Sequence, residues 1–193
     1  MREKEADLRG NVGAQQMLMK ENYFFKPKKS LGWLSLLILI ILFAFFTWVS
    51  FISYRITEGV GAFFSVVLFI GLAIGGILML VWFFSMKYEL AGDRLILHFG
   101  PFNYTIDLYL VENVESKSLF PTLGVGVMVP GFAKWFNSYK DEGKVFMCST
   151  RAMKDIILIT TGNGKIGISP AHEAEFIEEI NKRIQFVKLL ESE

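Results

Sequence analysis

The chain has 193 residues, 52% of them hydrophobic, and a formal net charge of +1. This length accommodates a pair of membrane-spanning helices and one further domain of roughly a hundred residues. Residues 87–193 hold twelve Lys and Arg against fourteen Asp and Glu, a balance of −2 that excludes a strongly basic nucleic-acid-binding domain. The single cysteine, Cys148, excludes an internal disulfide.

Residues 1–30 carry a charge of +3 and are predicted to be a cytoplasmic tether. Residues 1–18 are polar without a sustained period, which is typical of a disordered segment or a frayed helix. The last ten residues alternate aromatic side chains with lysines, a pattern suited to the lipid headgroup layer. The candidate membrane or partner contacts here are Lys26, Lys28 and Lys29. The alternative is that these lysines act only as a topology signal.

Residues 31–86 contain two uncharged runs, 31–54 and 60–86, separated by a short polar turn. A helix crosses the hydrocarbon core of a bilayer with about 20 apolar residues, so each run is long enough. A helix on the surface of a soluble protein shows a polar stripe, and neither run has one. The sequence therefore predicts a transmembrane helical hairpin.

Lysine positions predict the orientation of this hairpin. Four lysines lie between Lys20 and Lys29, Lys87 and Arg94 follow the second run, and the turn has only Arg55. The positive-inside rule then places both termini in the cytoplasm, in a multi-pass protein of the cell membrane. Neither run contains an ionisable residue, which disfavours a stand-alone ion or proton transporter.

Small residues in the second run form a candidate helix-packing face. Gly71 and Gly75 are four residues apart, a spacing that lets another helix approach closely. The partner is either the first helix of the same hairpin or a helix of another protein.

After residue 86 the sequence favours short strands joined by turns, followed by one helix. Ser169-Pro170 is a helix N-cap followed by proline, and Phe176, Ile180 and Ile184 recur at helical spacing on one face. The pattern indicates a small β-sandwich or barrel that a C-terminal amphipathic helix covers. The expected strands are 87–90, 94–99, 103–107, 111–118, 143–150, 155–161 and 165–169.

One apolar segment, residues 119–136, interrupts the strand pattern and is too short and too rich in Gly and Pro for a third spanning helix. It has three interpretations. It is a loop that enters the headgroup layer, with Lys134, Trp135 and Phe136 as the contacts; a groove or rim for a partner protein; or a buried crossover within the β-fold.

Several stretches resemble the bacterial pleckstrin-homology (PH)-like domains of unknown function, which often follow a transmembrane hairpin. The resemblance implies an α+β fold over residues 87–190, in which a β-sandwich or barrel is capped by the C-terminal helix. It implies this fold more securely than any activity. The stretches that carry it are Val129-Pro130-Gly131, Gly143-Lys144-Val145-Phe146, Ser149-Thr150, Ile168-Ser169-Pro170 and Phe176.

Catalytic chemistry finds little support in the sequence. His98, His172 and Cys148 are too few and too scattered for a typical metal site, and no phosphate-binding loop or nucleophile motif is present. We therefore expect no catalytic residue, metal or cofactor. The expected partners are membrane lipid and either a protein or a second copy of the chain, with no nucleic acid. Two hypotheses remain: a membrane-anchored binding or scaffold protein, and an accessory subunit of a larger membrane transporter or enzyme.

Overall fold

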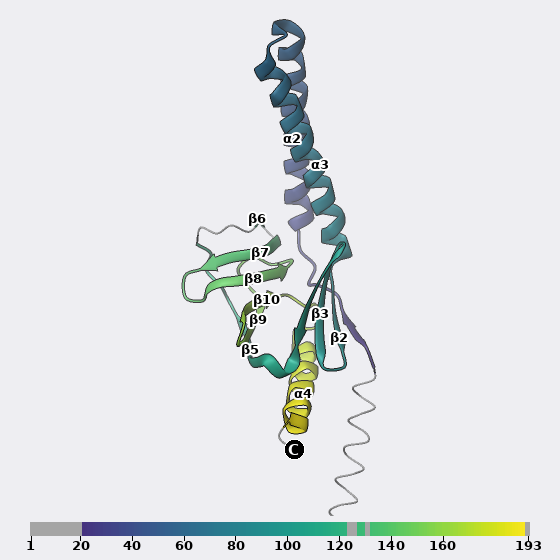
Figure 1. Ribbon diagram of the computed structural model, residues 1–193, viewed down its shortest axis with the longest axis vertical. Coiled ribbons are helices and arrows are strands. Elements are labelled where there is room, and N and C mark those ends of the chain that lie inside the picture. The colour runs from purple at the N-terminus through teal and green to yellow at the C-terminus, as the bar shows by residue number, and fades with distance from the viewer. Residues whose placement is uncertain (1–20, 123–126, 130–131, 192–193) are drawn as a thin grey trace, which may run out of the picture.

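The computed structural model describes residues 21–122, 127–129 and 132–191, so the expected disorder of residues 1–18 lies outside the described part. A helical hairpin projects from a domain of two β-sheets, and a C-terminal helix lies against that domain (Figure 1). The hairpin comprises α2 (Gly32–Thr57) and α3 (Val60–Ser85).

The two hairpin helices are long and apolar enough to cross a membrane. Each has 26 residues, with a mean hydropathy of 2.6 for α2 and 2.7 for α3 over the most apolar window. Only 6% of each window is buried, so these are not core helices of the domain. The hydroxyls of Thr47 and Ser65 donate to carbonyl oxygens four residues earlier, at 2.9 and 3.0 Å, which pairs these polar groups within their own helices.

The first sheet has the strand order β1-β2-β3-β4 and is antiparallel throughout. Strand β1 precedes the hairpin and β2 follows it, so the hairpin is inserted between two neighbouring strands, with Tyr23 opposite Leu90. Only Met86 separates α3 from β2. The strands are β1 (Tyr23–Phe25), β2 (Lys87–Ala91), β3 (Arg94–Phe99) and β4 (Phe102–Asp107).

The second sheet has the order β5-β9-β10-β8-β7-β6, with β8 and β10 parallel and the other pairs antiparallel. A 3-10 turn, η1 (Leu108–Leu110), connects the two sheets. At one end of the second sheet, Glu142 pairs with Lys117 and, at 2.7 Å, with Lys165. The strands are β5 (Val111–Lys117), β6 (Val127–Val129), β7 (Phe132–Tyr139), β8 (Gly143–Ser149), β9 (Ile156–Thr161) and β10 (Gly164–Ile168).

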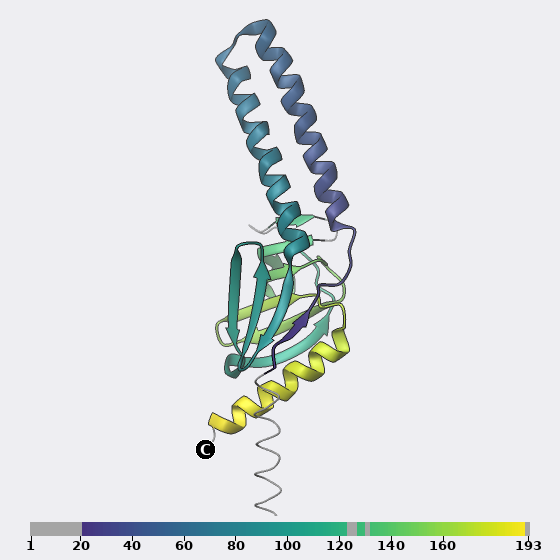
Figure 2. The ribbon, with the colours of Figure 1, turned by 90° about the vertical axis from the view of Figure 1, so that its right-hand side faces the viewer.

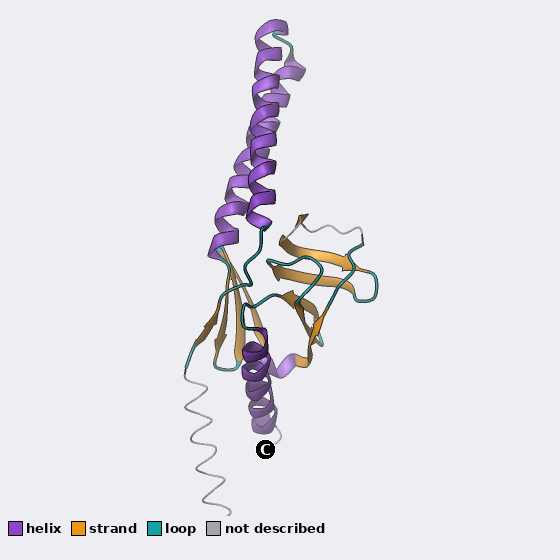
Figure 3. Ribbon diagram, turned by 180° about the vertical axis from the view of Figure 1, so that it is seen from behind, coloured by secondary structure: helices purple, strands orange, loops and turns teal. Residues whose placement is uncertain are grey.

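All seven predicted strands occur, and the two sheets form separate layers with α4 (Glu173–Glu191) at one end (Figure 3). The sheets are not closed into a barrel, so of the two predicted architectures the sandwich is correct. The C-terminal helix crosses the end of the domain remote from the hairpin (Figure 2). Its apolar face is buried at Phe176 and Ile180, and Phe25 of β1 packs edge-on against Phe176 at 5.1 Å between ring centroids.

Two buried polar side chains connect these layers. The hydroxyl of Tyr88 donates to the Cys148 carbonyl at 2.8 Å and accepts from the Ser169 N–H at 3.2 Å, which joins β2 to the second sheet. The guanidinium of Arg183 in α4 is 3% exposed and donates to the carbonyls of Leu90 and, at 2.9 Å, Glu21. The C-terminal helix therefore holds together the strands on either side of the hairpin insertion.

Candidate functional site

The segment that enters the hairpin, residues 26–31, is fixed to the second sheet by backbone hydrogen bonds. Lys28 N–H donates to the Ser169 carbonyl at 2.7 Å, and Ala171 N–H donates to the Lys26 carbonyl at 2.8 Å. The hydroxyl of Thr150 donates to the Lys28 carbonyl at 2.6 Å. The last residues of the predicted tether, immediately before α2, are thus bound to the domain.

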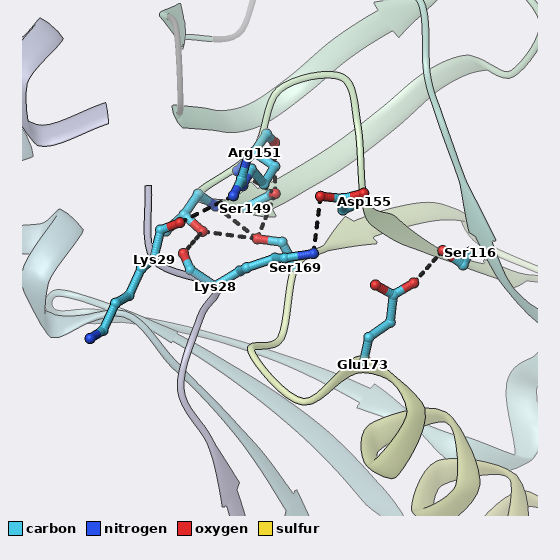
Figure 4. A network of polar contacts seen from close by, with 9 residues as sticks. Lys28, Lys29, Ser116, Ser149, Arg151, Asp155, Ser169 and Glu173 are labelled. Carbon is cyan, nitrogen blue, oxygen red and sulfur yellow. Dashed lines mark hydrogen bonds and ion pairs between the residues drawn. The ribbon is translucent and has the colours of Figure 1, made fainter. Parts of the chain in front are cut away.

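A buried hydroxyl cluster shapes the turn that faces this segment. Ser149 and Ser169 are fully buried, with their oxygens 2.9 Å apart, and Ser149 donates to the Arg151 carbonyl at 2.7 Å (Figure 4). The Thr150 N–H donates to Ser169 at 3.0 Å. These bonds hold residues 150–151 against residues 26–31, which we call the juxtamembrane segment because they lead into the candidate membrane helix α2.

Between this turn, the juxtamembrane segment and the hairpin base lies a groove of about 1120 Å³. This volume slightly exceeds the usual range for small-molecule sites, about 300–1,000 Å³. One wall is apolar and comes from the first two turns of α2 and the last turn of α3. The other wall is polar and basic. We call this feature the junction groove; its apolar wall includes Trp33, Leu34, Ile38 and Phe84, and its basic wall comprises Lys26, Lys28, Lys29, Lys87 and Arg151.

Charge in the junction groove has one sign. Among the described residues that line it, none is Asp or Glu. An acid outside the lining, Asp155, pairs with Lys28: the Lys28 Nζ lies 3.0 Å from its carboxylate oxygen, and Arg151 contributes more weakly to the same field. The hydrogen bond from Lys28 holds the pKa of Asp155 below its usual range. Lys26, Lys29 and Lys87 are exposed.

Arg151 supplies hydrogen-bond donors to the same wall. One terminal nitrogen donates to the Lys29 carbonyl at 3.3 Å, which orients the guanidinium along the juxtamembrane segment (Figure 4). Its Nε atom is buried and has no hydrogen-bond partner among the described residues. A guanidinium prefers to bind carboxylate or phosphate oxygens through pairs of neighbouring donors.

The start of α2 adds a further positive contribution to the junction groove. The first helical turn contains no acidic side chain, and Leu31, Leu34 and Ser35 line the groove. The Gly32 and Leu34 N–H groups are already bonded, to the Ser30 hydroxyl and the Leu31 carbonyl, but the aligned peptide dipoles still give the N-terminus of a long helix a partial positive charge, which favours an anion nearby. The basic wall and the N-terminus of α2 therefore both make the junction groove favourable for an anion.

A second unusual feature lies on the other side of the hairpin base, where Lys134 is buried. Its side chain is 4% exposed, and its Nζ has no hydrogen-bond partner among the described residues. Burial lowers the pKa of Lys134 from 10.5 to about 8. Four aromatic rings surround the ammonium in what we call the Lys134 cage; the ring centroids lie 3.3 Å away for Phe99, 4.8 Å for Trp82, 4.9 Å for Trp135 and 5.2 Å for Phe102.

The Lys134 cage joins three parts of the molecule, because Trp82 belongs to the last turn of α3, Phe99 and Phe102 flank the β3–β4 turn, and Lys134 lies in β7. Gly100 in that turn has φ +58°, and a Cβ there would overlap the Trp82 ring. Only glycine fits both the backbone conformation and the close approach. The hairpin base is thus packed directly on the domain.

Of the other two residues predicted in the apolar segment, Trp135 is 40% exposed and Phe136 is 57% exposed. Trp135 has φ +65°, which is rare for a bulky residue. Strand β7 consequently buries two residues in succession and then exposes two, and the amide of Asn137 donates to the Lys134 carbonyl at 3.0 Å. The segment thus combines a buried lysine with an exposed aromatic pair. Residues 123–126 and 130–131 lie outside the described part.

Glycines in α3 differ in what they contact. A Cβ added at Gly71 or Gly75 would meet nothing within 4 Å, whereas one added at Gly76 would lie 2.8 Å from Ile40 of α2. Gly76 is buried, so this residue provides the close approach within the hairpin. The face formed by Gly71 and Gly75 is open.

The cysteine and histidine side chains show no catalytic arrangement in the described residues. Burial raises the pKa of the Cys148 thiol to about 12, which disfavours the reactive thiolate. His98 bridges Glu89 at 2.7 Å and Asn103 at 2.8 Å across neighbouring strands. No three His, Cys, Asp or Glu side chains of the described chain lie close enough together to hold a metal ion.

The model of one protein family, described as Bacterial PH domain, matches residues 86–184. The chain belongs to the bacterial PH domain family. The match begins at Met86 and so covers strands β2 to β10 and most of α4, while β1 and the hairpin precede it. Comparisons with curated proteins and with solved structures give no match. Membership of this family supports a non-catalytic binding or scaffold domain and confirms the resemblance seen in the sequence.

The structure brings together only some of the predicted contact residues. Lys26, Lys28 and Lys29 share the junction groove, whereas Lys134 lies in a separate, aromatic environment. Arg151 was missed as a site residue because it follows a strand in sequence and nothing local links it to the juxtamembrane lysines. The turn Ser149-Thr150-Arg151 lies beside the lysines because the Lys28 N–H donates to the Ser169 carbonyl, a long-range contact that the sequence does not indicate.

Proposed function

We propose that the chain is a membrane-anchored, non-catalytic binding protein of the bacterial PH domain family. The hairpin crosses the membrane, and the domain lies on the cytoplasmic face, where it recruits a protein partner or a second copy of the chain. The family match and the two apolar helices support this proposal.

One observation carries the proposal: β1 and β2, which flank the hairpin, are neighbours in one sheet. Strands that pair directly must lie on the same side of a membrane, so a spanning hairpin has both ends on that side. Lysines flank these ends, and the turn around Glu58 has a single arginine, so the positive-inside rule favours the cytoplasm. The one-residue connection at Met86 keeps the domain against the membrane surface.

The alternative function is an accessory subunit of a larger membrane transporter or enzyme. The open face at Gly71 and Gly75 supports it, because small residues there leave room for the helix of another protein. In this case the hairpin provides the main contact with the partner, and the domain is secondary.

Cysteine labelling tests the proposed topology. Cys148 is 3% exposed, so a Cys148-containing chain gives little background with a membrane-impermeant maleimide. We expect Glu58→Cys to be labelled in intact cells and Lys140→Cys to be labelled only after the cells are opened. Labelling of Lys140→Cys in intact cells, or the absence of the protein from the membrane fraction, would overturn the anchoring scheme.

Crosslinking in native membranes, followed by mass spectrometry, separates the two functions. Crosslinks between copies, or to a protein that binds the domain, support the scaffold function. Crosslinks from α3 to one large membrane protein, lost in Gly71→Ile/Gly75→Ile but kept in the matched Gly61→Ile variant, support the accessory subunit. Gly61 is the control because a Cβ there also meets nothing within 4 Å.

A further inference from the structure

The junction groove has an apolar wall beside a basic wall. A small soluble anion would use only the basic wall, so the pair of walls suits a ligand with both an acidic and an apolar part. Its apolar wall runs from Leu34 to Ile38, and its basic wall carries Lys26, Lys29 and Arg151. Ile38 lies six residues into α2 from Gly32, roughly 9 Å along the helix axis. The groove therefore extends from the water boundary into the depth at which acyl chains begin in the proposed orientation.

The charges of the basic wall favour one class of headgroup. Lys28 is paired with Asp155, so three exposed lysines and Arg151 remain to bind an anion. The cluster of Arg151 with Lys26 and Lys29 on one wall, together with the positive end of α2, points to a phosphate, which accepts several hydrogen bonds at once. A zwitterionic headgroup would bring an ammonium group that the lysines and Arg151 repel, and no Asp or Glu lies among the described lining residues to pair with it.

We infer that the junction groove binds an anionic glycerophospholipid, with the phosphate held by Arg151, Lys26 and Lys29 and the acyl chains lying against Leu34, Ile38 and Phe84. This inference rests on the proposed membrane anchoring. A soluble phosphate ester shares the headgroup chemistry but would leave the apolar wall exposed to water. The lipid would act as a wedge between the hairpin and residues 150–151, so that its binding fixes the angle at which the domain meets the membrane.

Native mass spectrometry of the full-length chain tests the inference. The chain is reconstituted into liposomes of phosphatidylcholine and phosphatidylglycerol in equal amounts, extracted in mild detergent and analysed for bound lipid. We expect phosphatidylglycerol to be retained about ten-fold more than phosphatidylcholine, and soluble glycerophosphate to fail to displace it. Displacement by glycerophosphate would assign the groove to soluble phosphate esters and would overturn the lipid inference.

Two variants with equal charge change locate the binding site. Lys26→Gln/Lys29→Gln/Arg151→Gln is expected to lose retention about ten-fold or more, while Lys140→Gln/Lys144→Gln/Lys154→Gln, at exposed lysines outside the groove, retains the lipid. Phe84→Gln leaves every charge in place and is expected to weaken retention through the apolar wall. Equal retention of the two lipids, or equal loss in both triple variants, would overturn the inference.

Flotation of the same liposomes separates this inference from the proposed function. A wild-type chain that floats with the liposomes but shows no preference for phosphatidylglycerol disproves the lipid site alone. A chain that does not float disproves the membrane anchoring and, with it, the lipid site. Far-ultraviolet circular dichroism of each variant shows whether a loss of retention reflects unfolding, and the Phe84 variant supplies an independent reading if the basic triple variant is misfolded.

Discussion

Replacing Lys134 by methionine is the substitution whose effect on stability follows most directly from the structure. Methionine keeps the length of the side chain and removes its charge, while the aromatic rings of the Lys134 cage remain. Because burial lowers the pKa of Lys134 from 10.5 to about 8, the folded chain binds this proton more weakly than the unfolded chain does. Burial of the charged form therefore destabilises the fold.

The two pKa values set the size of this effect. The difference between 10.5 and about 8 corresponds to a penalty of about 3 kcal/mol at neutral pH. Contact of the ammonium with a desolvated aromatic face stabilises the folded chain by about 2 kcal/mol, and Lys134→Met removes this contribution together with the charge. We therefore expect Lys134→Met to stabilise the chain by about 1 kcal/mol at pH 7, which corresponds to about 2–4 °C in Tm.

The pH dependence distinguishes this explanation from a simple improvement in packing. Below pH 8 both states carry the proton and the penalty is complete, whereas between pH 8 and 10.5 only the unfolded state is protonated, so wild-type stability rises with pH. The gain from Lys134→Met should accordingly shrink over this range and vanish near pH 10.5.

Thermal unfolding of the full-length chain in detergent, followed by tryptophan fluorescence at pH 7 to 10.5, measures the effect. Lys144→Met, at an exposed lysine on β8, is the matched control and should leave both Tm and its pH dependence unchanged. A Lys134→Met chain that keeps the wild-type rise with pH would refute the assignment to Lys134. A loss of stability at pH 7 would show that the aromatic contacts outweigh the burial of the charge.

Three further substitutions test the packing and the polar contacts. Gly76→Leu places a side chain against α2 and should destabilise the hairpin by roughly 1–3 kcal/mol in detergent melts, whereas Gly71→Leu, on the open face, should not. The two lysine partners of Glu142 hold its pKa below the usual value, so its contribution is present above about pH 4.5 and is lost as the pH falls through the folded-state pKa. Glu142→Gln should thus lower stability by about 1 kcal/mol at pH 7 and flatten the acid side of a pH–Tm curve. Tyr88→Phe leaves two buried backbone groups unpaired and should lower the free energy of unfolding in urea by about 1–3 kcal/mol, while an unchanged value would mean that water replaces the hydroxyl.

Periodicity and turn chemistry predicted most of the fold. The uncharged runs gave the hairpin within three residues at each end, and short segments bounded by turn residues, such as the alternating residues 103–107, gave seven strands. Ser169-Pro170 marks the start of the last helical segment, because proline restricts the chain there and the following side chains repeat every three or four residues. These signals are local, so one sequence suffices to read them.

The remaining parts depend on contacts between distant residues. Strand β1 is three residues long, and its partner lies beyond the whole hairpin, so its aromatic residues suggested only a lipid contact. The burial of Lys134 requires four rings from four elements, α3, β3, β4 and β7, whereas a lysine beside tryptophan in the sequence resembles a surface residue. The φ of +65° at Trp135 then breaks the alternation that would have identified β7.

The insertion of the hairpin between β1 and β2 also determines the order in which the protein can assemble during synthesis. Asn22 and Glu89, whose side chains bond at 3.1 Å, are 67 residues apart, so β1 leaves the ribosome well before its partner exists. Pairing over such a separation is slow and leaves apolar strands exposed meanwhile. In the proposed orientation, insertion of the hairpin into the bilayer would bring the two strands together and shorten this search. Chains whose hairpin fails to insert would keep Phe25 away from its place on α4, leaving an incomplete sheet that quality-control proteases can recognise.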